Sequence, residues 1–251
     1  MNPIFAEQLA QYIKEARHAV FFGGAGVSCE SGIPDFRSQD GLYHQQWAYP
    51  PETILSHSFF LRRTEDFFRF YREKMLFPQA RPNAAHCALA KLEKQGMLSA
   101  VITQNIDGLH QAAGSKQVIE LHGSVFRNFC IKCRKSFLLE KIISQPGIPR
   151  CSCGGVIKPD VVLYEEKLPA AAIENAISEI DQADLLIIGG TSLSVYPAAG
   201  FVADYKGRLV IINLSPTPLD QKADLCIPSP IGETMEKVMQ LLEAKENKTE
   251  L

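Results

Sequence analysis

The sequence of 251 residues contains no hydrophobic run that approaches the ~18 consecutive apolar residues of a membrane-spanning helix. Its first residues, 1–11, also lack the basic stretch followed by an apolar run that marks a secretory signal peptide. We therefore expect a cytoplasmic protein with no membrane partner.

The chain also lacks a strong net charge, because 26 basic residues nearly balance 28 acidic ones. A net charge of −2 creates no field that would gather nucleic acid, so no specific nucleic-acid partner is expected. Internal repeats and low-complexity tracts are absent as well. With 46% apolar residues the chain can bury one substantial core, and we expect a monomer.

Short apolar runs alternate with helical patterns along most of the chain. The runs predict buried strands at residues 19–22, 99–103, 184–190 and 208–214. Helical spacing predicts helices at residues 3–18 and 83–95, after Pro169 from the spacing of Ile173, Ile177 and Ile180, and around 235–242. Strands that alternate with helices predict an α/β fold, with a Rossmann-like parallel sheet covered by helices on both faces.

Two segments interrupt this alternation. Residues 124–158 are rich in cysteine, basic residues, glycine and proline, and residues 39–79 resemble a helical insert. We expect these two inserts to form a small zinc-binding and helical domain. The Rossmann-like domain would then comprise residues 1–38, 80–123 and 159–251.

A glycine turn follows the first predicted strand. Gly24, Ala25 and Gly26 stand where a dinucleotide fold brings backbone N–H groups to a pyrophosphate, and a Cβ there would hold the phosphate away. Cys29 replaces the third glycine of the usual fingerprint, and no acidic residue ends a second strand about twenty positions on, which disfavours an ordinary dehydrogenase. A plain strand-to-loop turn remains the alternative for these glycines alone.

Polar side chains follow the predicted strand 99–103. Gln104, Asn105 and Asp107 stand where an open parallel sheet exposes its carboxyl ends, and helix capping explains only Asp107 well. Of the six histidines we single out His122, because it follows an apolar stretch and precedes a glycine. A histidine with a pKa near neutrality can take a proton from a ribose hydroxyl. From spacing alone, a structural role for His122 remains open.

Four of the seven cysteines occur in two close pairs. The pairs are Cys130 with Cys133 and Cys151 with Cys153. Four thiolates close a tetrahedral shell with no position for water, so we expect one structural zinc per chain. The other three cysteines are expected to be free thiols: Cys29, Cys87 and Cys226. Nearby basic residues could instead mark a nucleic-acid-binding ribbon, but a solvated face that also stabilises thiolates is the favoured interpretation.

These motifs occur together and in one order that resembles the sirtuin family, in a bacterial pattern closest to its undifferentiated class. They are Gly24 to Gly26, Pro34-Asp35-Phe36-Arg37, Gln104 to Asp107, His122 and the two cysteine pairs. The resemblance extends from about Leu9 to about Glu233. It implies an NAD-dependent protein-lysine deacetylase that consumes NAD and acts on acetylated proteins or peptides.

The resemblance also implies a role for each group of residues. His122 and Asn105 would be catalytic. The cofactor loop would contain Gly24, Ala25, Gly26, Cys29, Asp35, Phe36 and Arg37. Gln104 and Asn105 would meet the ribose, and Ile106 and Asp107 the nicotinamide carboxamide. The adenosine side would be held by Gly190, Thr191, Ser192, Asn213 and Leu214, with Ile231 near the adenine by position only. The peptide would lie as an added strand against Val162, Leu163, Tyr164, Val195 and Tyr196.

The implied reaction begins when the acetyl-lysine carbonyl oxygen attacks the nicotinamide ribose and nicotinamide leaves. His122 then helps the neighbouring hydroxyl to attack, and lysine and acetylated ADP-ribose are released. Two residues depart from the family pattern. Cys29 stands where a small hydroxyl residue is frequent, and Glu165 stands where the family commonly has glycine.

Other functions remain to be separated from this one. A protein ADP-ribosyltransferase would use the same site but leave ADP-ribose on the protein, and a long-chain deacylase would remove a larger acyl group. A non-enzymatic zinc-ribbon adaptor would not need His122 and would show steep salt dependence on nucleic acid.

The helix expected near residues 66–73 bears on acyl preference. Relatives that prefer succinyl-lysine carry a tyrosine and, three residues on, an arginine in this helix. In our alignment these places hold Phe68 and Tyr71, and Arg69 and Arg72 should point elsewhere at about 100° per residue. The resemblance therefore implies a neutral acyl preference, acetyl first.

Overall fold

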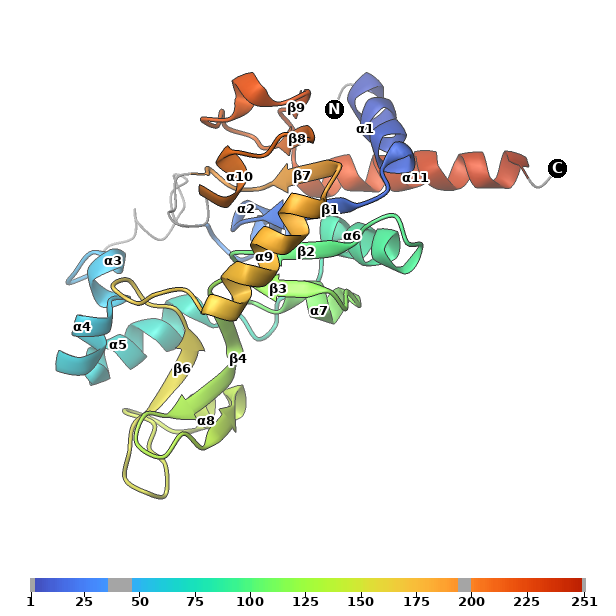
Figure 1. Cartoon of the computed structure of the whole chain (residues 1–251). Helices are drawn as coiled ribbons and strands as arrows, with labels where there is room; N and C mark the ends of the chain where they lie inside the picture. The colour runs from blue at the N-terminus through green and yellow to red at the C-terminus, as the bar shows by residue number, and fades with distance from the viewer. Residues whose placement is uncertain (1–2, 36–46, 194–199, 250–251) are drawn as a thin grey trace.

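The computed structural model describes residues 3–35, 47–193 and 200–249 (Figure 1). Its centre is a six-stranded sheet in the order β3-β2-β1-β7-β8-β9, in which every neighbouring pair is parallel. The strands are β1 (Ala19–Gly23), β2 (Ala100–Thr103), β3 (Val118–Glu120), β7 (Leu185–Gly189), β8 (Arg208–Ile212) and β9 (Leu225–Ile227). The predicted α/β class with a Rossmann-like parallel sheet is confirmed.

Helices cover both faces of this sheet because its strands are buried on both sides. In β1, Ala19 and Phe21 pack into one core while Val20 and Phe22 pack into the other. One face carries α1 (Pro3–Glu15), α6 (Ala84–Lys94) and α11 (Ile231–Thr249), and the other carries α9 (Ala170–Gln182) and α10 (Gly200–Ala203). The strands and helices expected from the sequence are all present, and the last of them, α11, extends beyond the expected residues 235–242 at both ends.

A second, three-stranded antiparallel sheet lies below the first in Figure 1. It consists of β5 (Ser136–Leu138), β4 (Gly123–Cys130) and β6 (Ile157–Val161), in that order. Short helices accompany it, namely α3 (Pro51–Ile54), α4 (His57–Arg62), α5 (Thr64–Phe70), the π-helical turn η2 (Tyr71–Met75) and α8 (Leu139–Ser144). The sequence did not predict this small sheet, nor the short strands β3 and β9. The domain boundaries given above stay a prediction.

The short connection from β3 to β4 joins the two sheets. Gly123 begins β4 with a left-handed backbone, φ 77°, and a Cβ at this residue would clash with the carbonyl oxygen of Asp160 on β6. Only glycine therefore fits at this crossing. Arg127 strengthens the junction, because its guanidinium binds Glu120 of β3 at 2.6 Å and Asp160 of β6 at 3.0 Å.

Three short helical turns complete the described chain. They are α2 (Gly26–Cys29), α7 (Leu109–Ala113) and the 3-10 turn η3 (Asp220–Lys222). Among the described residues, no helix combines the length and the apolar character needed to cross a membrane.

Two histidines that the sequence gave no reason to single out form a buried pair beneath the sheet edge. His86 on α6 and His110 on α7 are almost fully buried, and their ring centroids lie 4.7 Å apart. His86 Nδ1 accepts the N–H of Asn83 at the start of α6, whereas its Nε2 and both nitrogens of His110 have no partner among the described residues. The expectation that only His122 has a constrained setting was therefore wrong.

Burial keeps both rings of this pair neutral. It lowers the pKa of His86 to about 4, although Asp107 opposes the shift, and it lowers the pKa of His110 to about 3, with His86 adding to the effect. In the unfolded chain both histidines would titrate near the usual 6.5. Below that pH the unfolded state binds protons that the folded state does not bind. The contribution of the two neutral rings to the free energy of unfolding is therefore fully present above pH 6.5 and is lost as the pH falls.

The variant His110→Phe tests this linkage. Between pH 6 and 5 the wild-type free energy of unfolding should fall faster than that of the variant, by up to about 1.4 kcal/mol per pH unit, because the variant has one titrating group fewer. Denaturant unfolding at several pH values gives both slopes. Equal slopes would contradict the assignment of this buried ring.

Candidate active site and metal centre

The strand order reverses between β1 and β7 at the carboxyl edge of the large sheet. β2 and β3 lie on one side of β1, whereas β7, β8 and β9 lie on the other. In open α/β sheets a ligand binds in the crevice outside the carboxyl ends at this switch point. The turn after β1 and the turn after β7 flank it, and they carry Gly24 to Gly26 and Gly190 to Ser192.

These two turns touch backbone to backbone. Gly26 N–H donates to the carbonyl oxygen of Gly190 at 2.8 Å, and a Cβ on Gly26 would lie 2.8 Å from Gly190 Cα. Gly190 itself has φ 57°, and a Cβ on it would clash with the backbone of Val27. The sequence pattern predicts these glycines from the approach of a phosphate. The structure adds that the packing of the two turns already requires them.

Side chains from the turns after β1, β2 and β7 form one hydrogen-bonded cluster. The Gln104 amide donates to Thr191 Oγ1 at 3.1 Å. The Asn105 amide donates to the Gly24 carbonyl at 3.1 Å and to Ser28 Oγ at 3.0 Å. Both N–H groups of Asn105 are thereby used, which leaves its amide oxygen as the group that can accept a hydrogen bond.

Ser28 is a member of this cluster that the sequence analysis missed. Its buried hydroxyl donates to the Asp107 carboxylate at 2.7 Å. The other Asp107 oxygen accepts the N–H of Leu109 at 2.9 Å, so Asp107 caps the following turn and also binds Ser28. A serine after a glycine turn does not by itself indicate a functional residue. The role of Ser28 depends on the Asp107 carboxylate, which comes from a distant segment of the sequence.

His122 lies between the two sheets, directly before β4. Its Nδ1 is 2.8 Å from the carbonyl oxygen of Gln104. A carbonyl oxygen only accepts, so Nδ1 carries the hydrogen and Nε2 of the neutral ring has a free lone pair. Burial lowers the pKa of His122 below its usual 6.5 and outweighs this hydrogen bond, which raises it. The ring is therefore neutral, and can accept a proton, at neutral pH.

The remaining predicted cofactor residues differ in the burial of their side chains. The Cys29 side chain turns back along α2, with Sγ 3.6 Å from the Ala25 carbonyl, and partial burial with the charge of Asp35 raises the pKa of its thiol. Leu214 is exposed after β8, whereas Ile231 is buried in the core. The assignment of Ile231 to the adenine therefore stays a prediction. Phe36, Arg37, Val195 and Tyr196 lie outside the described residues.

Other predicted residues line the same edge. Ile106 follows Asn105 and packs against the core of the small domain, and its carbonyl oxygen accepts the N–H of Val125 on β4 at 3.0 Å. Asn213 follows β8, where its N–H donates to Ile227 and its side-chain amide donates to the Ser215 carbonyl at 2.7 Å.

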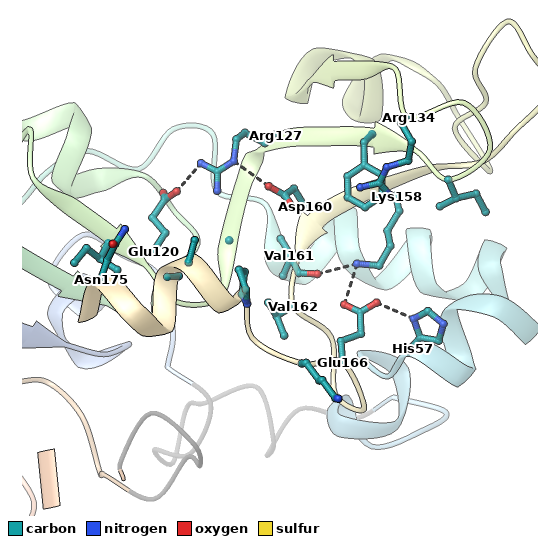
Figure 2. Close-up of a pocket in the computed structure, with 18 of the residues that line it drawn as sticks. His57, Glu120, Arg127, Arg134, Lys158, Asp160, Val161, Val162, Glu166 and Asn175 are labelled. Atoms are coloured by element: carbon teal, nitrogen blue, oxygen red, sulfur yellow. Dashed lines mark hydrogen bonds and ion pairs between the residues drawn. The ribbon is translucent and has the colours of Figure 1, made fainter. Parts of the chain in front are cut away.

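The segment predicted to hold the peptide leaves β6 toward α9. Val162 lines a groove of about 730 Å³ between β3, β4, β6 and the start of α9 (Figure 2). Leu163 is buried in the core of the small domain, whereas Tyr164 is 42% exposed. The segment's N–H at Val162 donates to the carbonyl oxygen of His122 at 3.0 Å, which ties it directly to the candidate base.

Glu166 anchors this segment from the groove side, as Figure 2 shows. Its carboxylate accepts the N–H of Leu163 at 2.9 Å, the ammonium of Lys158 at 3.0 Å and the ring of His57 at 2.7 Å. Burial would raise the pKa of Glu166, but these donors outweigh it and hold the pKa below its usual value. The Lys158 ammonium also binds the carbonyl oxygens of Pro159 and Val161, so it uses all three of its hydrogens.

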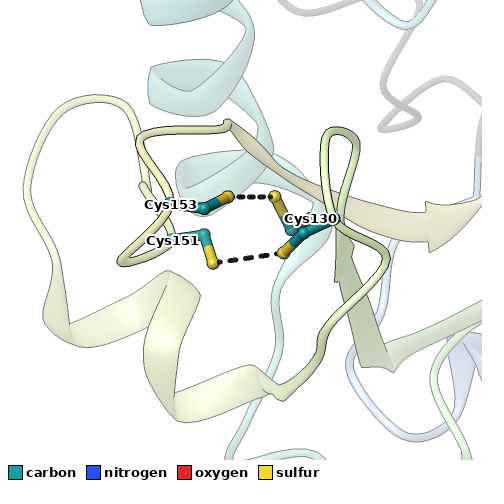
Figure 3. A group of neighbouring side chains, drawn as sticks. Cys130, Cys151 and Cys153 are labelled. Carbon is teal, nitrogen blue, oxygen red and sulfur yellow. Dashed lines mark hydrogen bonds between the residues drawn. The ribbon is translucent and has the colours of Figure 1, made fainter.

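The four predicted metal ligands converge in the small domain (Figure 3). Their Sγ atoms all lie within 4.8 Å of one another, with Cys130 3.5 Å from Cys153 and Cys133 3.6 Å from Cys151. Zinc–sulfur bonds of about 2.3 Å in a tetrahedron place sulfurs about 3.8 Å apart, so this set fits one structural zinc. A Cβ on Gly155 would lie 2.6 Å from Cys130 Sγ, which shows how closely the loops enclose the cluster.

Comparison with known proteins identifies the family. The model of the Sir2 family matches residues 24–197. A protein of Clostridium acetobutylicum named NAD-dependent protein deacetylase is 58% identical over 237 residues, which cover 92% of this chain and 97% of that protein. A structure of Sir2 with a p53 peptide and NAD+ superimposes with a TM-score of 0.85 at 41% identity, covering 95% of this chain and 98% of that one. Another, of Sir2 with a deacetylated p53 peptide and 3'-O-acetyl ADP-ribose, gives 0.86 at 41% identity and covers 93% and 97%.

The variant Cys151→Ser tests the metal centre. Changes to groups that only support a ligand cost roughly 10- to 100-fold in metal affinity, so loss of a ligand should cost at least as much. We expect about one zinc per wild-type chain by elemental analysis, little in the variant, and lower thermal stability of the variant because metal binding contributes to folding.

The matched control is Cys87→Ser, which removes an exposed thiol outside the cluster. It should retain its zinc and its melting temperature. A wild-type preparation that is pure and active but contains no zinc would contradict the assignment.

Proposed function

Because this chain belongs to the Sir2 family, we infer that it is an NAD-dependent protein-lysine deacetylase, which transfers the acetyl group to ADP-ribose and releases nicotinamide. Relatives from three species at 55–58% identity carry the name NAD-dependent protein deacetylase. The neighbouring structures contain a peptide together with NAD+ or with acetyl ADP-ribose, which are the co-substrate and a product of this reaction.

The arrangement of His122 is the observation that carries this function. Its free Nε2 lies on a ring that follows β3 and that the Gln104 carbonyl, in the turn after β2, orients. A neutral, oriented imidazole is suited to take a proton from a sugar hydroxyl. The backbone carbonyl of His122 also accepts the N–H of Val162. The residue that carries the base is therefore joined directly to the proposed peptide segment.

The surrounding residues have complementary roles in this proposal. NAD supplies the ribose carbon from which nicotinamide departs and to which the acetyl oxygen becomes attached. Asn105 presents its amide oxygen to the ribose, since both of its N–H groups are used within the protein. Asp107, held by Ser28, and Ile106 face the nicotinamide carboxamide, and Thr191, Ser192 and Asn213 hold the adenosine side.

The substrate would be an acetylated peptide segment bound as an added strand. Val162, Leu163 and Tyr164 would form one side of its site, since a segment that continues from a sheet strand can lie beside an extended peptide. Backbone pairing makes few demands on sequence, so many acetylated proteins could be accepted. This places specificity in the acyl-lysine itself.

Incubation of the protein with NAD and an acetylated peptide tests the function. Free nicotinamide, deacetylated peptide and acetylated ADP-ribose should appear in equal amounts. Mass spectrometry of the peptide separates this outcome from protein ADP-ribosylation, which would add ADP-ribose to the peptide. Absence of nicotinamide release would refute the proposed function.

We expect His122→Ala to lower turnover by roughly 10²-fold or more, as loss of a general base does. Binding of NAD should change little, because the side-chain hydrogen bonds of Gln104, Asn105 and Ser28 do not involve His122, whose ring contacts only the backbone carbonyl of Gln104. The control His18→Ala removes a histidine at the opposite edge of the sheet, before β1, and should keep its turnover. Near-normal turnover of His122→Ala would exclude this role.

The pH dependence offers a separate check on His122. A base acts in its neutral form, and burial lowers the pKa of His122, so activity should persist below pH 6.5 and fall at a lower pH. The acidic limb of kcat/KM, measured from initial rates, should therefore have its midpoint under 6.5. A midpoint clearly above 6.5 would mean that a charged partner, not burial, dominates around the ring.

The acyl group is proposed to be neutral, because the two arginines next to the predicted acyl-facing positions both have partners within the described part of the chain. Phe68 and Tyr71 are fully buried, and Arg69 pairs with Asp66 at 2.9 Å. The Arg72 guanidinium donates to carbonyl oxygens in α8 and just after it, which are those of Ile142, Gln145 and Gly147. Neither arginine is available to a bound carboxylate, and an unpaired buried charge is costly.

Rates on one peptide bearing acetyl-, succinyl- or long-chain acyl-lysine test this preference. Acetyl-lysine should react at least about tenfold faster than succinyl-lysine, since even 1.4 kcal/mol of uncompensated charge burial gives that factor. Measuring all three at the same NAD concentration separates acyl preference from cofactor binding. Faster removal of succinyl than of acetyl would show that Phe68 and Tyr71 are not the residues that face the acyl group.

A further inference from the structure

Glu165 has a backbone conformation that a residue with a side chain rarely adopts. Its φ is 75°, in the left-handed region where glycine is usual. Such a conformation persists only where the surrounding structure compensates for it, and it tends to occur where geometry matters for function. Glu165 lies directly after the proposed peptide segment, Val162 to Tyr164.

One residue of α4, Ser58, compensates for this backbone conformation. The two carboxylate oxygens of Glu165 accept the backbone N–H of Ser58 at 2.8 Å and the Ser58 hydroxyl at 2.9 Å. The left-handed backbone is what turns the side chain toward this partner. A glycine at position 165 would adopt the same φ freely but could not make either bond.

These contacts extend a short stretch of backbone pairing. Tyr164 N–H donates to the Leu55 carbonyl, and His57 N–H donates to the Tyr164 carbonyl, both at 3.0 Å. The Glu165 carboxylate carries the pairing one residue further along α4, to Ser58. On the groove side Glu166 binds His57 on the same turn, as Figure 2 shows. The segment is thus fixed at its outer end by Glu165 and at its inner face by Glu166.

We propose that Glu165 is a positioning residue for the peptide substrate, whose carboxylate holds the Val162–Tyr164 segment against α4 in the conformation that accepts an added strand. An added strand binds through backbone groups, and these must be aligned before the bonds can form. A segment that is already ordered saves the cost of ordering it upon binding. This inference rests on the proposed function, because it assumes that the segment binds the acetylated peptide.

The variant Glu165→Gly tests the proposal through the kinetic parameters. It relieves the backbone restriction and releases the segment from Ser58. The KM for the acetylated peptide should rise about three- to tenfold, because the free segment must be ordered again at each binding event. Turnover at saturating peptide and the KM for NAD should stay within about twofold, since the base and the cofactor contacts are untouched. Glu165→Ala provides a second variant that lacks the carboxylate but keeps a Cβ.

Glu165→Gln separates the hydrogen bonds from the charge. Its amide oxygen can still accept the Ser58 N–H, and its amide N–H can donate to the Ser58 hydroxyl. It should therefore restore a peptide KM close to that of the wild type. The control Glu174→Gln removes a negative charge from an exposed position on α9 and should leave all parameters unchanged.

Several results would overturn the positioning role. One is an unchanged peptide KM in Glu165→Gly. Another is a peptide KM in Glu165→Gln that is as high as in Glu165→Gly. A third is a decrease in turnover with no change in the peptide KM. Direct binding of a fluorescent acetylated peptide keeps this test separate from the proposed function. A wild-type chain that binds the peptide but releases no nicotinamide would refute the function alone, whereas equal peptide affinities of wild type and Glu165→Gly would refute the positioning role alone.

Discussion

The backbone contact between two glycine turns is the constraint on which the site depends. The turn after β1 and the turn after β7 meet at the switch point, joined by the hydrogen bond from Gly26 to Gly190. A side chain on either glycine would force the turns apart. Because Asn105 bonds to Gly24 and Gln104 to Thr191, the turn after β2 takes its position from this contact as well. Separation of the turns would therefore displace the whole polar cluster.

The second determinant is the junction between the two sheets, where His122 lies. Its ring takes its orientation from the large sheet, through the Gln104 carbonyl, while its own carbonyl binds Val162, which follows β6 of the small sheet. Arg127 holds the same junction from the groove side by pairing with carboxylates on β3 and β6. A rotation of one sheet relative to the other would change the position of the base relative to the peptide segment. The zinc cluster stabilises the small sheet at its far end and contributes to this geometry only indirectly.

The sequence could predict the large sheet because its central strands are buried on both faces and appear as continuous apolar runs, such as residues 184–190. The small sheet could not be predicted in this way, because Arg127 and Lys158 interrupt the buried apolar residues of its strands and form ion pairs. Ser28 and the His86–His110 pair were missed for another reason. Their settings depend on segments that are distant in the sequence and meet only in the fold.

The two departures from the family pattern show why a substitution must be judged by its backbone. At Cys29 the chain is helical, so the backbone does not favour glycine, and the thiol turns toward the Ala25 carbonyl. At Glu165 the left-handed conformation favours glycine, and a side chain there is destabilising unless it gains a partner. Ser58 is that partner, and its position depends on α4, which is more than a hundred residues earlier in the sequence. A glutamate at position 165 therefore needs a hydrogen-bond donor on α4 to offset its backbone conformation. A cysteine at position 29 needs no such partner, because its backbone is helical.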